Sequence, residues 1–237
     1  GYAEELMGKA ISDRRDKVFL MTKNCERDYK GSMSNLDDSL KRLKTDRIDL
    51  WQFHEINYDN DPEWVFRTEG ALEAALAARE AGKIRYIGFT GHKSPHILQR
   101  MLDMDFAWDT CQLPINVLDV HYRSFQKEIL PELNRRNIGA IGMKSLGGRG
   151  QLVSDLGLTA QQCRRYALSL PISTLICGIQ SQENLEQDLA IARDFSPMSV
   201  TERKALADSV YEEAGDGRYE WFNSFQPYDS PDPREHH

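Results

Sequence analysis

The residues best suited to proton chemistry stand at the ends of two apolar segments. Val18–Lys23 is an apolar run that closes with a lysine, and Ile48–Phe53 reads as a buried strand followed directly by His54. A lysine can lower the pKa of a nearby acid, and a histidine can hydrogen-bond a substrate oxygen. Taken singly, each has a commoner explanation: a lysine that extends to solvent, and a satisfied core histidine. At neighbouring strand ends, the two together predict a shared site.

The ends of the later strands also carry notable residues. In a parallel α/β barrel, functional side chains lie at the carboxyl ends of the strands. The residues in those positions are Thr90, Gln112, Met143, Lys144 and Gly178. We therefore expect these positions to face the same edge as Lys23 and His54.

Strands and helices alternate along the chain. Apolar runs predict six strands, at residues 18–23, 48–53, 86–91, 110–113, 138–143 and 174–177. Ser34 and Asp37 match a helix-capping pattern, and Pro131 either kinks the helix expected at 125–136 or marks its start. Such alternation is typical of a doubly wound sheet or a (β/α)8 barrel. The sequence contains no G-x-G-x-x-G motif, which favours the barrel. We expect one domain over residues 1–237, with an irregular tail at 221–237.

The composition excludes several classes of protein. The chain has 237 residues, a formal net charge of −7 and no Lys/Arg run, so nucleic acid is not expected as a partner. It contains no apolar stretch near the ~20 residues of a membrane helix, and no signal peptide. Its four cysteines are far apart, which argues against a zinc site or a disulfide framework and fits a reducing cytoplasm.

Seven segments, in order, make the sequence resemble the aldo-keto reductase family over about residues 3–220. They are EELMGKAI, VFLMTK, LKRLKTDRIDLWQFH, GKIRYIGFTGH, CQLPIN, LPELNRRNIGAIGMKSLGGRG and ICGIQSQENLEQDL. The resemblance implies a (β/α)8 barrel that binds NADP(H) without a Rossmann fold. It also implies direct hydride transfer between the nicotinamide and the carbonyl carbon of a small-molecule substrate.

The resemblance assigns roles to individual residues. Lys23 and His54 match two members of the family's catalytic Asp, Tyr, Lys and His set. Thr90 and Gln112 would bind the nicotinamide carboxamide, and Met143 would pack against the ring. Lys144, Ser145 and the loop at 147–150 would lie along the pyrophosphate, although that loop is equally explained as a plain turn. The segment from Gly178 to Asp188, which includes Gln187, would surround the adenosine. No metal site is expected, because the four cysteines are far apart.

The sequence departs from the family in two respects. The family's Asp and Tyr precede the EELMG segment, so the first two strands, the Asp and the Tyr are expected to be absent from this sequence. Tyr2 is a poor match to the catalytic tyrosine, because Gly1 better matches the glycine that follows it. Residues 178–188 hold no Lys or Arg, and Glu183, Glu186 and Asp188 would repel a 2′-phosphate, which makes NAD(H) a plausible cofactor.

Two functions from different classes follow. The first is a cytoplasmic NAD(P)H-dependent carbonyl reductase. The second is a non-catalytic nicotinamide-binding regulatory or partner-binding subunit on the same fold. The substrate depends on loops around the site, and the sequence gives no indication of the oligomeric state.

Overall fold

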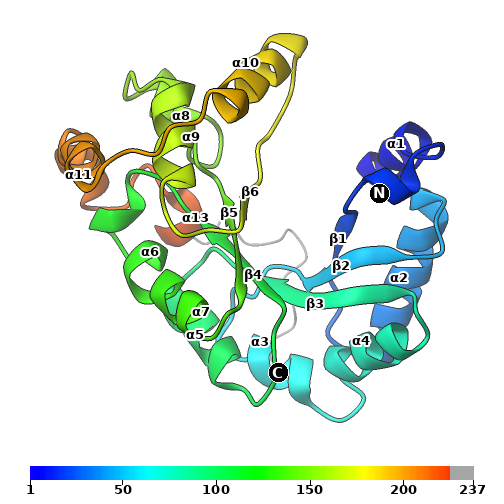
Figure 1. Cartoon of the computed structure of the whole chain (residues 1–237). Helices are drawn as coiled ribbons and strands as arrows, with labels where there is room; N and C mark the ends of the chain where they lie inside the picture. Colours follow the sequence, from blue (N-terminus) through cyan, green and yellow to red (C-terminus); the bar gives the residue numbers. More distant parts are fainter. Residues whose placement is uncertain (225–237) are drawn as a thin grey trace. The chain divides into compact units, whose positions relative to one another are not determined.

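The computed structural model describes residues 1–224, in which strands and helices alternate (Figure 1). The six strands follow one another through the sheet in chain order. They are β1 (Met21–Asn24), β2 (Ile48–Phe53), β3 (Ile84–Thr90), β4 (Thr110–Pro114), β5 (Gly139–Met143) and β6 (Thr174–Leu175). The first helical elements are α1 (Tyr2–Ala10), the 3-10 turn η1 (Arg15–Lys17), α2 (Tyr29–Leu43), α3 (Asp61–Phe66), α4 (Ala71–Glu80) and α5 (Pro95–Asp103). The later ones are η2 (Asp119–His121), α6 (Phe125–Glu128), α7 (Leu130–Arg135), α8 (Gln151–Ser154), α9 (Ala160–Leu168), α10 (Gln182–Arg193), α11 (Val200–Asp208), α12 (Tyr211–Ala214) and α13 (Trp221–Ser224).

The described residues divide into two compact units. The first unit comprises residues 1–91 and 100–110, and the second comprises residues 92–99 and 111–224. In the first unit β1 pairs with β2, and β2 pairs with β3, in parallel register. All six residues of β2 are buried, as expected for a strand covered on both faces.

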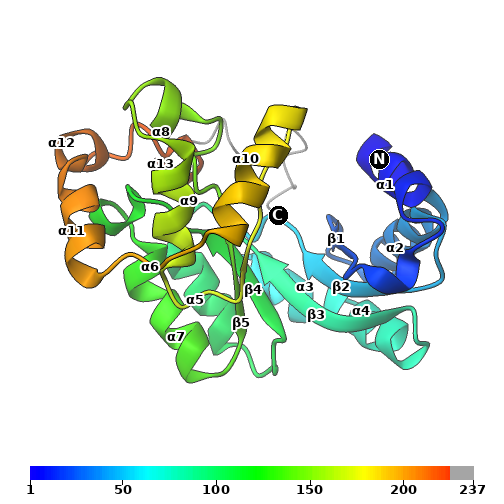
Figure 2. The same cartoon turned by 45° about the horizontal axis from the view of Figure 1, so that its top comes forward.

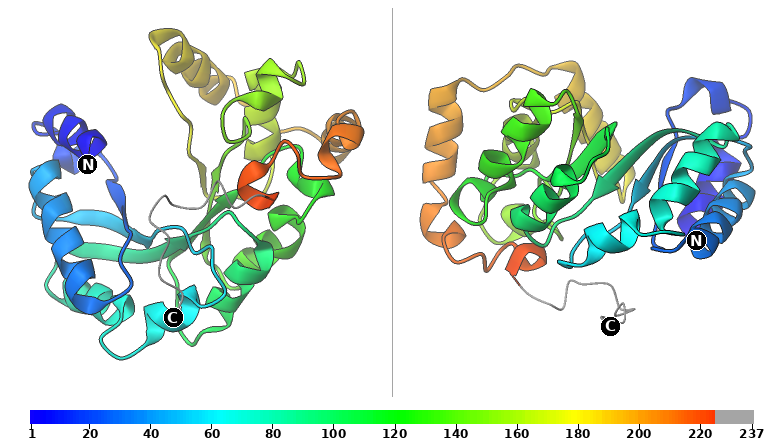
Figure 3. Two further views of the ribbon diagram at one scale, coloured as in Figure 1. Left: turned by 180° about the vertical axis from the view of Figure 1, so that it is seen from behind. Right: turned by 90° about the horizontal axis from the view of Figure 1, so that it is seen from below.

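Helices α1, α2 and α4 pack together in the first unit (Figure 3). Leu36 and Leu43 of α2 are buried on the helix face that this packing covers. Helix α4 buries four alanines, and the small side chains allow a close approach of the helices. Gly8 of α1 is needed for the same reason, because a Cβ there would lie 2.5 Å from the Arg42 carbonyl oxygen.

In the second unit β5 pairs with β6 in parallel, and α9 lies beside α10 (Figure 2). Its apolar core includes Val117, Leu152, Tyr166, Met198 and Val210. This core holds the helices that follow β5 against the loop that follows β4. The second unit therefore contains the ends of β5 and β6, where the sequence predicts ligand-binding residues.

The structure corrects one local prediction and confirms another. Ser34 does not begin a helix, because Asp28 caps α2 six residues earlier by accepting a hydrogen bond from the Gly31 amide at 2.8 Å. Pro131 stands in the first turn of α7, which confirms that it marks a helix start.

The predicted irregular tail is described only at its beginning. Residues 221–224 form α13, and residues 225–237 lie outside the described residues. Within residues 1–224, the helices are too short or too polar to cross a membrane.

A buried carboxyl anchors the C-terminal part of the second unit. Glu220 is 1% exposed and accepts a hydrogen bond from the Asn116 amide at 2.9 Å. Burial, together with the nearby charge of Asp119, raises the pKa of Glu220 to about 8. Burial also raises the pKa of Asp119, to about 7, but Asp119 accepts hydrogen bonds from Ser124, Phe125 and Gln126, which favour its ionised form, whereas Glu220 accepts one from Asn116. We therefore assign the proton of the pair to Glu220.

We expect the protein to lose stability as the pH rises from the ordinary Glu pKa of 4.5 to about 8. In this range the folded state binds one more proton at Glu220 than the unfolded state does, so raising the pH favours unfolding. Glu220→Gln should flatten this pH dependence and stabilise the protein by about 1–3 kcal/mol at the alkaline end. Urea unfolding across this range measures the effect, with Glu212→Gln, at an exposed position, as the control. An equally steep profile for Glu220→Gln would contradict the assignment.

Candidate active site

Lys23, His54 and Thr90 lie on one face of the sheet in the first unit. Lys23 is the register partner of Gln52, and Gln52 is the partner of Gly88. Partners in a parallel sheet share a face, and so do residues two positions apart on one strand. His54 follows Gln52 by two positions, and Thr90 follows Gly88 by two. The His54 amide donates to the Asn24 carbonyl at 2.8 Å, which continues the ladder past the end of β2.

Lys23 is a half-buried cation. Burial lowers its pKa, and the nearby Cys25 thiol acts in the opposite direction. Among residues 1–224 the Lys23 ammonium forms no ion pair with a carboxylate. A partly dehydrated ammonium of this kind favours an anion placed next to it, because the anion offsets the cost of burying the charge.

Cys25 is a neighbour of His54 that the sequence reasoning missed. Its sulfur lies 3.4 Å from the His54 Nδ1. Cys25 and Lys23 are two residues apart, so alternation along the strand directs them to one side. Cys25 follows directly after β1, and its place beside a predicted strand end was the signal that could have identified it.

A buried ion pair holds the loops that carry these residues. Arg27 and Asp61 have side chains only 3% and 2% exposed, and the Arg27 Nε donates to Asp61 at 2.8 Å. Arg27 also donates to the His54 carbonyl at 2.6 Å and to the Glu55 carbonyl at 3.2 Å. The second Asp61 oxygen accepts the amides of Asn57 and Tyr58. This pair therefore fixes the position of His54 relative to the loop that follows β1.

Tyr2 does not belong to the face of Lys23 and His54. It is the first residue of α1 and is 74% exposed. In the same turn, Glu4 accepts a hydrogen bond at 2.6 Å from Thr22, which alternates with Lys23 and so faces the other side of β1. This agrees with the poor match of Tyr2 to a catalytic tyrosine.

A groove of about 520 Å³ lies in the second unit, at the ends of β5 and β6. Seven residues assigned to the cofactor in the sequence line it: Gln112, Met143, Lys144, Ser145, Gly178, Gln187 and Asp188. The loop at 147–150 lines it as well. Gly147 has a φ of +78°, and a Cβ there would lie 2.6 Å from Gln151, so this tight loop requires a glycine.

Gln112 presents an unsatisfied acceptor in this groove. Its Nε2 donates to the Met143 sulfur at 3.2 Å, whereas its Oε1 is buried and has no hydrogen-bond partner within residues 1–224. A buried polar atom without a partner costs free energy, so a site that leaves one open is prepared for a donor from a ligand. A primary carboxamide, such as that of nicotinamide, is a donor of this kind.

Arg164 of α9 is a groove residue that the sequence reasoning missed. Its guanidinium donates to the Ser145 hydroxyl at 2.5 Å and to the two Asp188 oxygens at 3.1 and 3.3 Å. Asp188 was expected to repel a phosphate, but its charge is paired with Arg164. Residues 178–188 themselves hold no Lys or Arg, and the basic residue beside Asp188 comes from α9.

The charged residues that line the groove are Lys144, Arg149, Arg164 and Asp188. Three cations against one carboxylate leave a net charge of +2. Lys144 and Arg149 each lie over an aromatic ring, 5.0 Å from the centroid of Phe222 and 5.3 Å from that of Trp221. Such a lining suits a ligand with two negative charges, such as a pyrophosphate.

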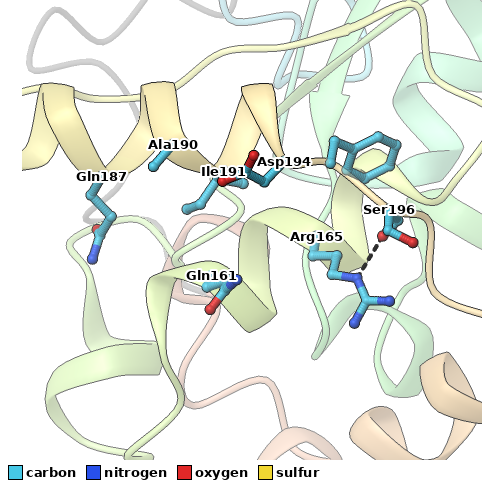
Figure 4. A pocket seen from close by; sticks show the side chains of 8 residues that line it. Gln161, Arg165, Gln187, Ala190, Ile191, Asp194 and Ser196 are labelled. Carbon is cyan, nitrogen blue, oxygen red and sulfur yellow. Dashed lines mark hydrogen bonds between the residues drawn. The ribbon is translucent and has the colours of Figure 1, made fainter.

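A smaller cavity of about 210 Å³ lies between α9 and α10 (Figure 4). Arg165, the neighbour of Arg164, lines this cavity and donates to the Ser196 carbonyl at 2.5 Å. Gln187 lines this cavity as well as the groove. The two consecutive arginines of α9 therefore have different surroundings.

The chain belongs to the Aldo/keto reductase family, whose model matches residues 1–156. Aldo-keto reductase YhdN of Bacillus subtilis is 31% identical over 144 residues, which cover 54% of this chain and 38% of YhdN. Aldo-keto reductase yakc [NADP(+)] of Schizosaccharomyces pombe is 32% identical over 145 residues, with the same coverage of 54% and 38%. The chain spans 38–56% of the length of three of the curated relatives that it matches.

The fold is that of the aldo-keto reductases, which are (β/α)8 barrels. The structure of aldo-keto reductase AKR11C1 from Bacillus halodurans in its holo form superposes with a TM-score of 0.70 at 20% identity. The superposition covers 87% of this chain and 76% of that one. The six strands of this chain thus match part of a barrel, as the alternation of strands and helices predicts.

Proposed function

We propose that this chain supplies the lysine, the histidine and the nucleotide site of an NAD(P)H-dependent reductase of aldehydes or ketones. The observation that carries the proposal is the strand register that directs Lys23 and His54 to one face at the ends of adjacent strands. The family supports the reaction type, since its members are oxidoreductases. A bound reduced nicotinamide would supply a hydride to the carbonyl carbon, and the acid adjacent to Lys23 would supply the proton to the carbonyl oxygen.

Each residue has a role that follows from its surroundings. His54 would hydrogen-bond the carbonyl oxygen and orient it, because its backbone is fixed by Arg27. Lys23 would lower the pKa of an adjacent acid and stabilise its anion, because the half-buried ammonium favours a neighbouring negative charge. Arg27 and Asp61 would not contact the substrate but would position the histidine.

The residues of the groove fit a nicotinamide dinucleotide. Gln112 offers an acceptor for the carboxamide. Met143 would pack against the nicotinamide ring, and Lys144 and Ser145 would lie along the pyrophosphate. Gly178, Gln187 and Asp188 would surround the adenosine. One relative is named for NADP(+), whereas the absence of Lys and Arg from residues 178–188 favours NAD(H).

The proposal includes the setting of the reaction. We propose that residues 1–237 form part of a single barrel domain and that the protein works in the cytoplasm, for which the wide spacing of its four cysteines is the support. The regulatory-subunit alternative finds no specific support in residues 1–224.

Nucleotide-dependent reduction of a panel of small aldehydes and ketones tests the proposal. We expect reduced nicotinamide to be consumed only when a carbonyl compound is present, and to bind to the protein without one. Binding without turnover of any carbonyl compound would favour a regulatory subunit. Failure to bind NADH, NADPH or ADP-ribose would reject the proposed nucleotide site altogether.

Gln112→Met is expected to weaken the binding of NAD(P)H by roughly tenfold, the effect of one lost hydrogen bond of about 1.4 kcal/mol. The affinity for ADP-ribose should not change, because ADP-ribose has no carboxamide. Titration of both ligands by calorimetry measures the difference. Equal weakening of the two would show that Gln112 supports the groove rather than the nicotinamide.

A further inference from the structure

We propose that Arg164 is a positioning residue that joins the two walls of the nucleotide groove and so sets the affinity for the whole dinucleotide. One wall is the segment after β5, which contains Ser145, and the other is α10, which contains Asp188. The inference rests on the proposed function, because it concerns the same groove.

The geometry of Arg164 is that of a structural link. The side chain is only 6% exposed, and Ser145 is fully buried. Nη1 donates to Ser145, while Nε and Nη2 donate to the two oxygens of Asp188. A planar guanidinium fixes the direction of all of its hydrogen bonds at once, which a lysine ammonium cannot do. One side chain therefore sets the positions of two groove residues that lie 43 positions apart in the sequence.

These contacts prepare both partners for a ligand. Because Arg164 donates to the Ser145 oxygen, the Ser145 hydrogen is left to donate to another acceptor, such as a phosphate oxygen. Each Asp188 oxygen accepts one N–H from Arg164 and retains lone pairs for a further donor, such as an adenosine hydroxyl or amino group. Holding these groups in place before binding reduces the ordering cost that the ligand would otherwise bear.

The same contacts argue against direct capture of a 2′-phosphate by Arg164. Three of its N–H groups are directed to Ser145 and Asp188, and the side chain is buried. A positioning residue affects NADH and NADPH alike, whereas a 2′-phosphate ligand would affect NADPH alone. This difference separates the two roles by measurement.

The test measures dissociation constants of NADH and NADPH for the full chain by calorimetry. We expect Arg164→Met to weaken both by a similar factor of roughly 10–100, which corresponds to the loss of charge-assisted hydrogen bonds. Arg164→Lys should recover only part of the affinity, since an ammonium cannot hold both partners. In turnover, the KM for the nucleotide should rise more than kcat falls.

Arg165→Met is the matched control. It removes an arginine from the next position of the same helix, where the side chain binds the Ser196 carbonyl rather than the groove (Figure 4). We expect this variant to retain the affinity of the unaltered protein. Asp188→Asn weakens the contact of Arg164 with α10, and Ser145→Ala removes its contact with the segment after β5. These two variants replace Arg164→Met in the test if Arg164→Met does not fold.

The outcomes distinguish this inference from the proposed function. No nucleotide binding by the unaltered chain would overturn both. If the unaltered chain binds nucleotide and Arg164→Met binds it with unchanged affinity, the role of Arg164 alone is overturned. If Arg164→Met does not fold, unchanged affinities in both Asp188→Asn and Ser145→Ala overturn it instead. A loss confined to NADPH would assign Arg164 to the 2′-phosphate and would also overturn it.

Discussion

Replacement of Lys23 with methionine is expected to abolish carbonyl reduction and to make the protein more stable at neutral pH. The loss of kcat should be roughly 10²–10⁴-fold, the range for a residue that supports proton transfer. The gain in the free energy of unfolding should be about 0.5–2 kcal/mol, because methionine removes a cation that is costly to bury. A residue retained for function at the expense of stability behaves in this way.

The pH dependence of stability provides a second readout for Lys23. Burial lowers its pKa in the folded state below the ordinary value of 10.5, so the unfolded state binds more protons between the two values. Stability should therefore rise with pH in this window, and the rise should disappear in Lys23→Met. Lys17→Met, at an exposed position, is the control and should change neither activity nor this slope. Unchanged turnover in Lys23→Met would reject the catalytic role, and a lower stability would reject the account of its burial.

Loss of either member of the buried Arg27–Asp61 pair is expected to destabilise the protein by about 3–5 kcal/mol. Arg27→Met leaves the Asp61 carboxylate buried without its guanidinium and removes the donors to the His54 and Glu55 carbonyls. The same change should lower kcat in the fraction that stays folded, because His54 loses its support. Replacing both residues with apolar ones should cost less than either single change, since no unpaired charge remains.

Urea unfolding of Arg27→Met, Asp61→Leu and the double variant measures these differences. Arg100→Met is the control, because Arg100 pairs with Asp59 at 3.4 Å where the two side chains are 34% and 72% exposed. An exposed pair contributes at most about 1 kcal/mol. A double variant less stable than both single variants would show that the pair is important for its packing and not for its charge.

The sequence predicted the strands better than the contacts between loops. Lys23 and His54 could be placed because each ends or follows an apolar run, and adjacent parallel strands bring their ends to one edge. The observed bounds of the strands differ from the predicted ones by a few residues, as in β1, which begins at Met21 rather than at Val18. Such shifts leave the order of the strand ends unchanged.

The sequence did not predict the contacts between side chains that are far apart along the chain. Arg27 and Asp61 are 34 residues apart, and Arg164 and Ser145 are 19 apart, so no local pattern links them. The sequence misplaces the start of α2 because Asp28 and Ser34 are both of residue types that cap helices. Only the hydrogen bond that Asp28 accepts from the Gly31 amide shows that Asp28 is the cap. Four residues of the groove, Gln112, Met143, Lys144 and Gly178, stand at the strand ends that the sequence predicts, whereas the basic residue from α9 does not.

Every residue that lines the groove belongs to the second compact unit. A ligand stabilises the conformation that binds it, by about 1.4 kcal/mol for each tenfold rise in concentration above the dissociation constant. Saturation with nucleotide should therefore slow the amide hydrogen exchange of β5, β6 and α9 more than that of β1 and β2. Nucleotide occupancy could then be read from exchange rates alone, without any substrate or turnover.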